Sequence, residues 1–244
     1  MVPDLPPGLT DALRSAGHTV VLTGSGVSAE SGVPTFREAQ TGLWERFDPQ
    51  ELATPEAFGR DPKLVWDWYA WRRKLVAEAS PNPGHAAIAE MERLFSDFTL
   101  ITQNVDGLHQ RAGSGEVIEL HGNILRTKCS VEDLVVDEYE VGESPPCCPS
   151  CGAPLRPDVV WFGEMLPFDA LEAASEAARG SDLFLSVGTS SLVYPAAALP
   201  FDALENGATL VEINPEPTPL TPHADYSVRA PAGETLPQLV AAII

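Results

Sequence analysis

His121 is the side chain in this sequence whose type and position most favour acid–base chemistry. It directly follows the apolar run 117–120 and precedes Gly122. An imidazole with its ordinary pKa of about 6.5 is a workable general base at neutral pH. A lone histidine is more often a hydrogen-bonded structural residue, but His121 is the histidine that ends a predicted strand. That position favours a catalytic role.

Amide and carboxylate side chains gather directly after the apolar segment 98–102. They are Gln103, Asn104 and Asp106, with Val105 between them. One such residue would be explained as a helix N-cap, but three exceed what a cap needs. Amides and carboxylates together can bond ribose hydroxyls and a carboxamide, the groups that the nicotinamide riboside half of NAD presents. The cluster therefore favours a nucleotide site.

A glycine-rich loop, Gly24-Ser25-Gly26, follows the apolar run 20–22 and is expected to open a helix. Glycines let a backbone approach a pyrophosphate closely, and a helix N-terminus supplies N–H donors. A tight turn explains the same glycines equally well. The third glycine comes late, at Gly32, and no acidic residue ends a second strand about 20 positions on. The loop therefore does not indicate ordinary dehydrogenase chemistry.

All four cysteines lie between Cys129 and Cys151, which favours a local metal site over a disulfide framework. Cys148 and Cys151 form a knuckle, and Cys129 lies where the other half of a zinc ribbon should be. The fourth ligand should then stand at position 132, which holds Glu132. Either Glu132 coordinates, or Cys147 substitutes for it, or the site is degenerate and empty. We favour a structural zinc.

The segment 62–76 carries apolar residues at helical spacing, and Arg72 falls inside that apolar stripe. Tyr69 lies three residues earlier, on the same face. A charge on a burying face must be paired. A structural ion pair with a nearby carboxylate meets that requirement. A pocket in which guanidinium and phenol meet an incoming carboxylate meets it too.

Strand-like and helix-like segments alternate, which predicts an α/β fold with a Rossmann-like, doubly wound parallel sheet. The predicted strands are 19–22, 98–102, 117–120, 182–187, 209–213 and 226–229. The predicted helices are 62–76, 84–95, 168–179, 195–205 and 235–244. Five of the apolar segments run directly into small or polar clusters. Because ligands bind outside the carboxyl ends of parallel strands, these clusters should form the rim of one large site.

Two segments interrupt the alternation. Residues 35–80 hold a tryptophan-rich helical pattern, and residues 124–154 contain all the cysteines. We expect a smaller lobe made of a helical insertion, 35–80, and a zinc-ribbon-like insertion, 124–154. The ranges 1–34, 81–123 and 155–244 would then form the Rossmann-like NAD-binding domain.

The composition limits the partners. The chain has 244 residues, of which 44% are hydrophobic and 20% charged, as in globular proteins. Its formal charge of −20 argues against nucleic acid and suits a cationic partner such as a lysine-rich segment, although acidity that only maintains solubility is a simpler explanation. No stretch approaches the roughly 18 apolar residues of a membrane span. The first residues show no targeting leader, so a cytoplasmic protein is expected.

Taken together, these motifs resemble the sirtuins, the NAD-dependent protein lysine deacylases. The segment 24–37 resembles that family's NAD-binding loop, and 103–106, 121–122, 188–190 and 214–216 match its later motifs in order. The segment 159–164 is similar to the strand that pairs with substrate peptide. The similarity runs from about residue 19 to about residue 236. Tyr69 and Arg72 match the Tyr-x-x-Arg pair of the class that removes succinyl and malonyl groups.

The resemblance implies roles for the matching residues. His121 and Asn104 would be catalytic, and the zinc ligands would include Cys129, Cys148 and Cys151. Acyl-lysine proteins or peptides would be bound by Tyr69, Arg72, Val160, Trp161 and Phe162. NAD would be bound by Gly24, Ser25, Gly26, Val27, Ser28, Ala29, Glu30, Thr35, Phe36, Arg37, Gln103, Asn104, Val105, Asp106, Gly188, Thr189, Ser190, Asn214, Pro215, Glu216 and Ala232. Three residues depart from the pattern of many members: Ser25, Glu132 and Ala232.

The resemblance also implies the reaction. The acyl-lysine oxygen would attack C1′ of the nicotinamide ribose, and His121 would then act as general base on a ribose hydroxyl. The products would be free lysine, nicotinamide and O-acyl-ADP-ribose. A mainly deacetylating enzyme, an NAD-dependent protein ADP-ribosyltransferase and a non-enzymatic NAD sensor are the alternatives.

Overall fold

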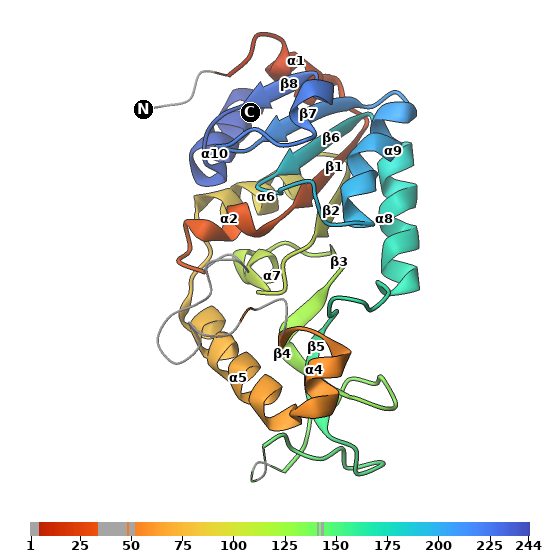
Figure 1. The fold of residues 1–244 in the computed structure, drawn as a ribbon. Coiled ribbons are helices and arrows are strands. Elements are labelled where there is room, and N and C mark those ends of the chain that lie inside the picture. Colours follow the sequence, from red (N-terminus) through yellow and green to blue (C-terminus); the bar gives the residue numbers. More distant parts are fainter. Residues whose placement is uncertain (1–4, 34–47, 49–51, 141, 143) are drawn as a thin grey trace.

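The computed structural model describes residues 5–33, 48, 52–140, 142 and 144–244. Its centre is a six-stranded parallel sheet in the order β3-β2-β1-β6-β7-β8 (Figure 1). The strands are β1 (His18–Thr23), β2 (Asp97–Thr102), β3 (Val117–Glu119), β6 (Leu183–Val187), β7 (Thr209–Ile213) and β8 (Tyr226–Val228). The predicted doubly wound α/β fold is confirmed, and each predicted strand ends within one residue of its observed bounds.

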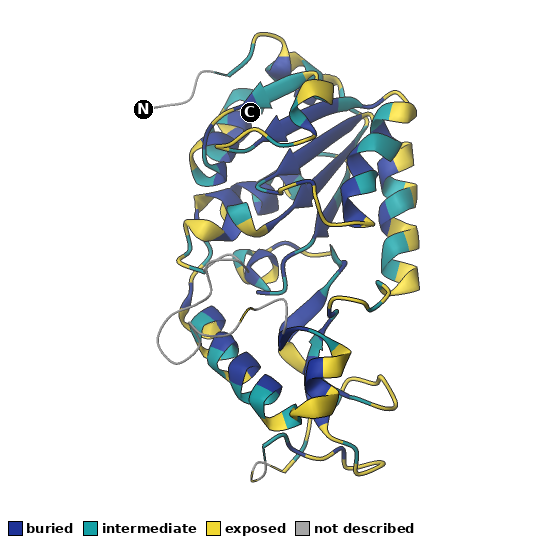
Figure 2. Ribbon diagram, viewed as in Figure 1, coloured by how far each residue is buried: buried dark blue, intermediate teal, exposed yellow. Residues whose placement is uncertain are grey.

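Helices cover both faces of this sheet. One face packs against α1 (Leu9–Ser15), α6 (Pro83–Leu94) and α10 (Ala232–Ile243), and the other against α8 (Phe168–Gly180) and α9 (Leu199–Glu205). Strand β1 shows why both faces must be covered. Val21 belongs to the first apolar core, whereas Val20 and Leu22 belong to the second. Since successive side chains of a strand point to opposite faces, a strand with apolar residues at successive positions must be covered on both faces of the sheet. Figure 2 shows the sheet as the most buried part of the molecule.

Two of the five helix predictions differ from the structure by three or more residues at their start, and the others by at most two residues at either end. The predicted helix 195–205 is divided into a 3-10 turn, η2 (Ala196–Ala198), and α9. Pro200 lies in the first turn of α9, where its missing N–H is not needed, so the helix starts there and not earlier. Helix α10 begins at Ala232, three residues before the predicted start. Three further short helices are α2 (Ser25–Ala29), α7 (Leu108–Ala112) and η3 (Thr221–His223).

A smaller group of elements lies below the sheet in Figure 1. It contains α4 (Pro55–Arg60), α5 (Pro62–Glu78) and the antiparallel pair β4 (Gly122–Cys129) and β5 (Leu155–Val159). Buried aromatic residues join these elements in a core of their own, to which Trp68, Tyr69 and Trp161 belong. The expected division into the ranges 1–34, 81–123 and 155–244, with insertions 35–80 and 124–154, stays a prediction.

The glycine loop is held against the neighbouring loop at the point where the sheet order reverses, between β1 and β6. The N–H of Gly26 donates to the carbonyl oxygen of Gly188 at 2.8 Å. A Cβ added at Gly26 would come within 2.8 Å of the Gly188 backbone, and one at Gly188 within 2.5 Å of the Val27 nitrogen. Gly188 also has a φ of +62°, which favours glycine. The close approach of two backbones therefore requires these glycines, and it places the two loops at the sheet's switch point, where open α/β sheets bind ligands.

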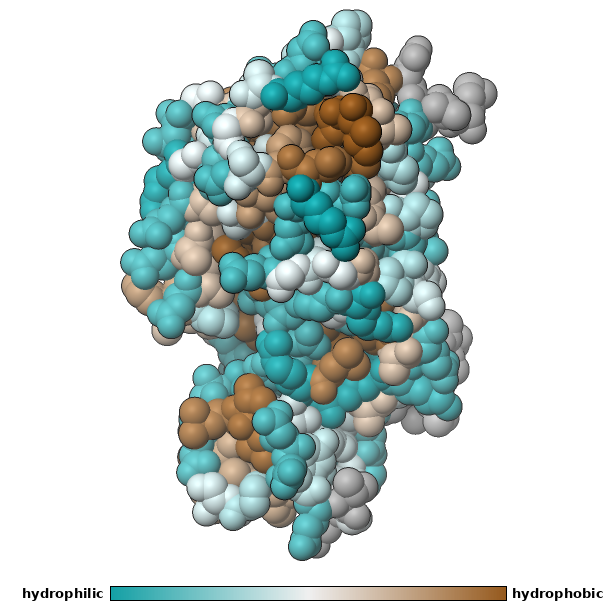
Figure 3. Space-filling model, turned by 180° about the vertical axis from the view of Figure 1, so that it is seen from behind, coloured by the Kyte–Doolittle hydropathy of each residue, from teal (hydrophilic) through white to brown (hydrophobic). Residues whose placement is uncertain are grey.

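The hydropathy of the surface is shown for one side of the molecule in Figure 3. Seen from behind, it is mainly hydrophilic, with separate apolar patches on the upper and lower parts (Figure 3). Among the described residues, no helix combines the length and the apolar character that crossing a membrane would require.

Candidate active site

A cavity of about 480 Å³ opens between the carboxyl edge of the sheet and the smaller group of elements. It is lined by residues from the loops that follow β1, β2, β3 and β6, and by residues of α5 and of the segment after β5. The predicted site residues that line it are Gly24, Ser25, Ser28, Tyr69, Arg72, Gln103, Asn104, Val105, Asp106, His121, Val160, Trp161, Phe162, Thr189 and Ser190. Segments that are far apart in the sequence thus meet around one space, as the strand-end pattern predicted.

Three further predicted NAD residues, Thr35, Phe36 and Arg37, lie outside the described residues. The described NAD residues that do not line the cavity are Gly26, Val27, Ala29, Glu30, Gly188, Asn214, Pro215, Glu216 and Ala232.

Several of these residues hold the surrounding structure together. The side chain of Asn214 donates to the carbonyl oxygen of Thr189 at 2.9 Å and so holds the loop after β6. The carboxylate of Glu30 accepts from the N–H of Gly233 at 2.7 Å, in the first turn of α10. Ala232 is buried in the apolar core between α10 and the sheet. Their contribution to NAD binding stays a prediction.

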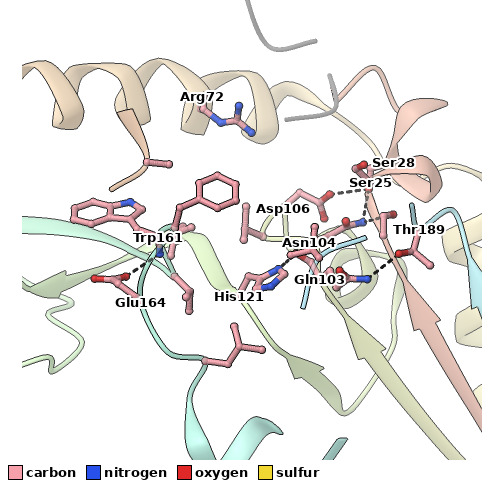
Figure 4. A pocket seen from close by; sticks show the side chains of 18 of the residues that line it. Ser25, Ser28, Arg72, Gln103, Asn104, Asp106, His121, Trp161, Glu164 and Thr189 are labelled. Atoms are coloured by element: carbon pink, nitrogen blue, oxygen red, sulfur yellow. Dashed lines mark hydrogen bonds between the residues drawn. The ribbon is translucent and has the colours of Figure 1, made fainter. Parts of the chain in front are cut away.

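The imidazole of His121 is fixed by one hydrogen bond. Its Nδ1 lies 2.9 Å from the backbone carbonyl oxygen of Gln103. Because a carbonyl can only accept, Nδ1 carries the proton and Nε2 keeps a lone pair. Burial lowers the pKa of His121 below its ordinary value, an effect that the bond to Gln103 partly offsets. Figure 4 shows the ring in the cavity beside Asn104 and across from Arg72. A neutral imidazole with a free lone pair is the form that a general base requires.

The amide cluster has one member with a structural explanation. Asp106 accepts from the N–H of Leu108 at 2.9 Å, at the start of α7, and from the hydroxyl of Ser28 at 2.7 Å. Asp106 thus satisfies a free N–H of the first turn of α7 from the position before the N-cap residue, Gly107. Asn104 instead donates through Nδ2 to the carbonyl oxygen of Gly24 at 3.0 Å and to Ser28 at 3.2 Å. Its position is fixed by both neighbours, and it lines the cavity between the glycine loop and His121 (Figure 4).

Two buried histidines behind this cluster are site residues that the sequence reasoning missed. Nδ1 of His85 accepts from the N–H of Asn82, so its Nε2 donates to the hydroxyl of Ser28 at 3.3 Å. Ser28 in turn donates to Asp106, so the hydrogen bonds run in series from Asn82 through His85 and Ser28 to the carboxylate of Asp106. The ring of His109 lies 4.9 Å from that of His85, and burial lowers its pKa to about 3. His85 therefore supports the carboxylate of Asp106 through Ser28, whereas His109 bonds to the hydroxyl of Thr23 at 2.9 Å.

A signal for His85 was present in the sequence. Asn82 precedes Pro83, the pattern of an N-cap followed by proline in the first helical turn, which places His85 at the third helical position. There its ring completes a capping box with Asn82.

Tyr69 and Arg72 lie on the opposite wall of the cavity, on α5. Tyr69 is 2% exposed and Arg72 is 9% exposed, and both line the cavity. The guanidinium of Arg72 lies 5.0 Å from the centre of the Trp68 ring. Burial raises the pKa of Tyr69 to about 12, so its phenol keeps its proton. The two donors are thus placed where an anion entering the cavity would meet them.

The segment 159–164, which resembles the family's peptide-pairing strand, is a strand in this structure only at its first residue. Val159 ends β5, and the N–H of Glu164 then donates to the carbonyl oxygen of Trp161, closing a turn. The side chain of Trp161 is buried against Phe58, with ring centres 5.2 Å apart, and this packing draws the chain out of the β4–β5 pair. Gly163, with a φ of +87°, allows the turn.

The cysteine cluster contains Glu132 as its fourth member. One ligand atom from each of Cys129, Glu132, Cys148 and Cys151 lies within 4.8 Å of the others. Three sulfurs and one carboxylate oxygen at such spacing fit a structural zinc ion. Cys147 is not in this cluster and is exposed, so the alternative in which it replaces Glu132 finds no support among the described residues.

Comparisons with known proteins agree with this geometry. Residues 24–195 match the Sir2 family. The chain is 57% identical over 233 residues to NAD-dependent protein deacylase 2 of Pyrobaculum aerophilum, covering 95% of this chain and 93% of that protein. It is 56% identical over 223 residues to the NAD-dependent protein deacylase of Aquifex aeolicus, covering 90% of this chain and 92% of that one.

Two solved structures extend the comparison. A complex of a Sir2 homologue with NAD is 48% identical, has a TM-score of 0.92 and is matched over 99% of this chain and 94% of its own. A complex of Sir2 with a p53 peptide and NAD⁺ is 31% identical, has a TM-score of 0.85 and is matched over 96% of this chain and 97% of its own. This chain belongs to the Sir2 family, the sirtuins.

Proposed function

We propose that this chain is an NAD-dependent protein lysine deacylase that prefers succinyl and malonyl groups and also removes acetyl groups. The observation that supports the preference is the arrangement of one cavity. His121 and Asn104 lie on the sheet side, and Tyr69 and Arg72 lie on the α5 side. An acyl group whose carbonyl lies near His121 could thus extend toward a guanidinium and a phenol. A carboxylate at its far end would be neutralised there.

NAD, when bound, would supply an electrophilic ribose carbon that exchanges nicotinamide for the acyl oxygen, and one water would be consumed as the lysine amine is released and the acyl group leaves on ADP-ribose. The chain's own residues would orient the ribose and take a proton from one of its hydroxyl groups. His121 would accept a proton at Nε2 from a ribose hydroxyl, because its Nδ1 is held by Gln103. Asn104, fixed by Gly24 and Ser28, would hold the ribose and carboxamide in a reactive pose.

The other assignments follow the same proposal. The glycine loop and the loop after β6 would hold the phosphates, and the segment from Val160 to Phe162 would bind the acyl-lysine peptide. Zinc would be held by Cys129, Cys148 and Cys151 together with Glu132. Its role would be structural and not catalytic, because these residues do not line the cavity. The acidic surface suits lysine-rich protein substrates.

The test compares acetyl-, malonyl- and succinyl-lysine peptides of one sequence, with and without NAD. We expect NAD-dependent deacylation of all three peptides and a higher kcat/KM for the two acidic groups. A higher kcat/KM for acetyl-lysine would make the enzyme mainly a deacetylase. ADP-ribose attached to the peptide, detected by mass spectrometry, would indicate an ADP-ribosyltransferase, and no turnover at all would indicate a sensor.

A further inference from the structure

We propose that Trp161 is a positioning residue for acyl selectivity: its indole N–H holds the Tyr69 oxygen and so directs the phenol O–H toward an acidic acyl group. This inference rests on the proposed preference for succinyl and malonyl groups. It adds a residue that acts through Tyr69 and does not itself touch the acyl carboxylate.

The direction of the hydrogen bond between the two side chains is unambiguous. Nε1 of Trp161 lies 3.0 Å from the hydroxyl oxygen of Tyr69, and both residues are 2% exposed. An indole nitrogen can only donate, so the Tyr69 oxygen accepts. The phenol proton must therefore point away from Trp161. Within the described part of the chain, the Tyr69 hydroxyl has no second hydrogen-bond partner, and its residue lines the cavity.

Trp161 is held on both sides, so its N–H cannot turn. The Arg156 guanidinium carbon lies 3.3 Å from the centre of the Trp161 ring, and Phe58 packs 5.2 Å away. Arg156 in turn donates to both carboxylate oxygens of Glu164, at 2.6 and 2.8 Å. The backbone N–H of Trp161 donates to the same carboxylate at 2.8 Å.

The contacts of Glu164 with Arg156 and Trp161 also occupy a competing acceptor for the phenol proton. Glu164 lines the cavity near Tyr69, and a carboxylate there would attract the phenol proton. Because both of its oxygens already accept from Arg156 and Trp161, Glu164 is satisfied without Tyr69. The phenol O–H stays available for a ligand.

The consequence depends on the acyl group. A succinyl or malonyl group ends in a carboxylate, which can accept from the Tyr69 O–H and from Arg72. An acetyl group ends in a methyl group and has no acceptor for either donor. Loss of the Trp161 N–H frees the phenol to rotate, so it weakens recognition of acidic groups more than recognition of acetyl groups.

The test measures the ratio of kcat/KM for succinyl-lysine to kcat/KM for acetyl-lysine, in a Trp161→Phe variant and in the same substitution on a Tyr69→Phe background. One directed neutral hydrogen bond corresponds to about a three- to tenfold change. We expect Trp161→Phe to lower the ratio by that factor, mainly through KM for the succinyl peptide. On the Tyr69→Phe background the same substitution should not lower the ratio further, since the phenol is already absent.

A second substitution separates the hydrogen bond from packing. If Trp161→Phe does not fold, site-specific 3-benzothienylalanine at position 161 replaces the N–H by sulfur at nearly the same shape. It should lower the ratio as Trp161→Phe would.

Three results would overturn the inference. An unchanged ratio on loss of the N–H is one, and a fall that persists on the Tyr69→Phe background is another. In both cases a wild-type enzyme that prefers acidic groups leaves the proposed function standing. A wild-type enzyme with no such preference would overturn the proposed function and this inference together.

Discussion

The ring of His121 donates from Nδ1 to the backbone carbonyl oxygen of Gln103 across 2.9 Å. This bond joins the loop that follows β3 to the loop that follows β2, so the two neighbouring strands set the orientation of the imidazole. It also leaves Nε2 as the basic nitrogen. The predictions below begin from this arrangement.

His121→Ala should abolish turnover while NAD and acyl-peptide binding remain. Loss of a general base costs typically 10²- to 10⁴-fold in rate. Nicotinamide release measures turnover, and titration calorimetry measures the two affinities. His223→Ala, at the distant turn η3, is the matched histidine control and should keep full activity. Full activity in His121→Ala would mean that the imidazole is not the base.

The pH profile should have an acid limb below the ordinary pKa of histidine. Burial lowers the pKa of His121 from 6.5, so its neutral form persists to lower pH than that of an exposed imidazole. A base must be neutral to accept a proton, so kcat/KM should fall only when the pH drops below 6.5 and through the lowered pKa. Initial rates with the succinyl peptide between about pH 5 and pH 8 test this. A midpoint above 6.5 contradicts the buried, neutral imidazole.

Arg72→Met should impair desuccinylation far more than deacetylation. A hydrogen bond to a charged group contributes about 1.5–3 kcal/mol, which corresponds to roughly 10- to 150-fold in kcat/KM. Lys74→Met removes a positive charge from the exposed face of the same helix and should change neither activity. Equal losses on both acyl groups would assign Arg72 a structural role, as the ion-pair alternative holds.

Glu132 should prove to be a zinc ligand. Purified protein should contain about one zinc per chain, and Glu132→Ala should lose it faster to a chelator, whereas Cys147→Ser should not. Substitution with Co²⁺ gives a spectroscopic measure that does not depend on activity. The thiolate charge-transfer absorption should indicate three sulfurs in the wild type and four in Glu132→Cys. Zinc loss in Cys147→Ser but not in Glu132→Ala would reverse the assignment.

Much of the fold could be predicted because its signals are local. A strand such as β6, Leu183–Val187, is apolar at every position except Ser186, and its burial on both faces follows from a parallel sheet covered by helices. The strand-end clusters then had to share one edge, which is why Asn104 and His121 could be placed in one site without coordinates.

The features that escaped prediction depend on partners distant in sequence. His85 and Ser28 are 57 positions apart, and no local pattern indicates that they bond. The role of Glu132 depended on whether its carboxylate reaches Cys148, at 3.6 Å, which spacing alone left open. The turn after Val159 accompanies the burial of Trp161 against Phe58, a residue of α4 that is distant in sequence.

The central claim is that one cavity joins the base His121 to a pocket for acidic acyl groups, and a product analysis tests it most directly. Wild-type enzyme is mixed with NAD and a succinyl-lysine peptide, and the products are counted by mass spectrometry. We expect one free lysine, one nicotinamide and one O-succinyl-ADP-ribose per turnover, and none of them with His121→Ala. Free lysine formed without NAD, or ADP-ribose attached to the peptide, would contradict the claim.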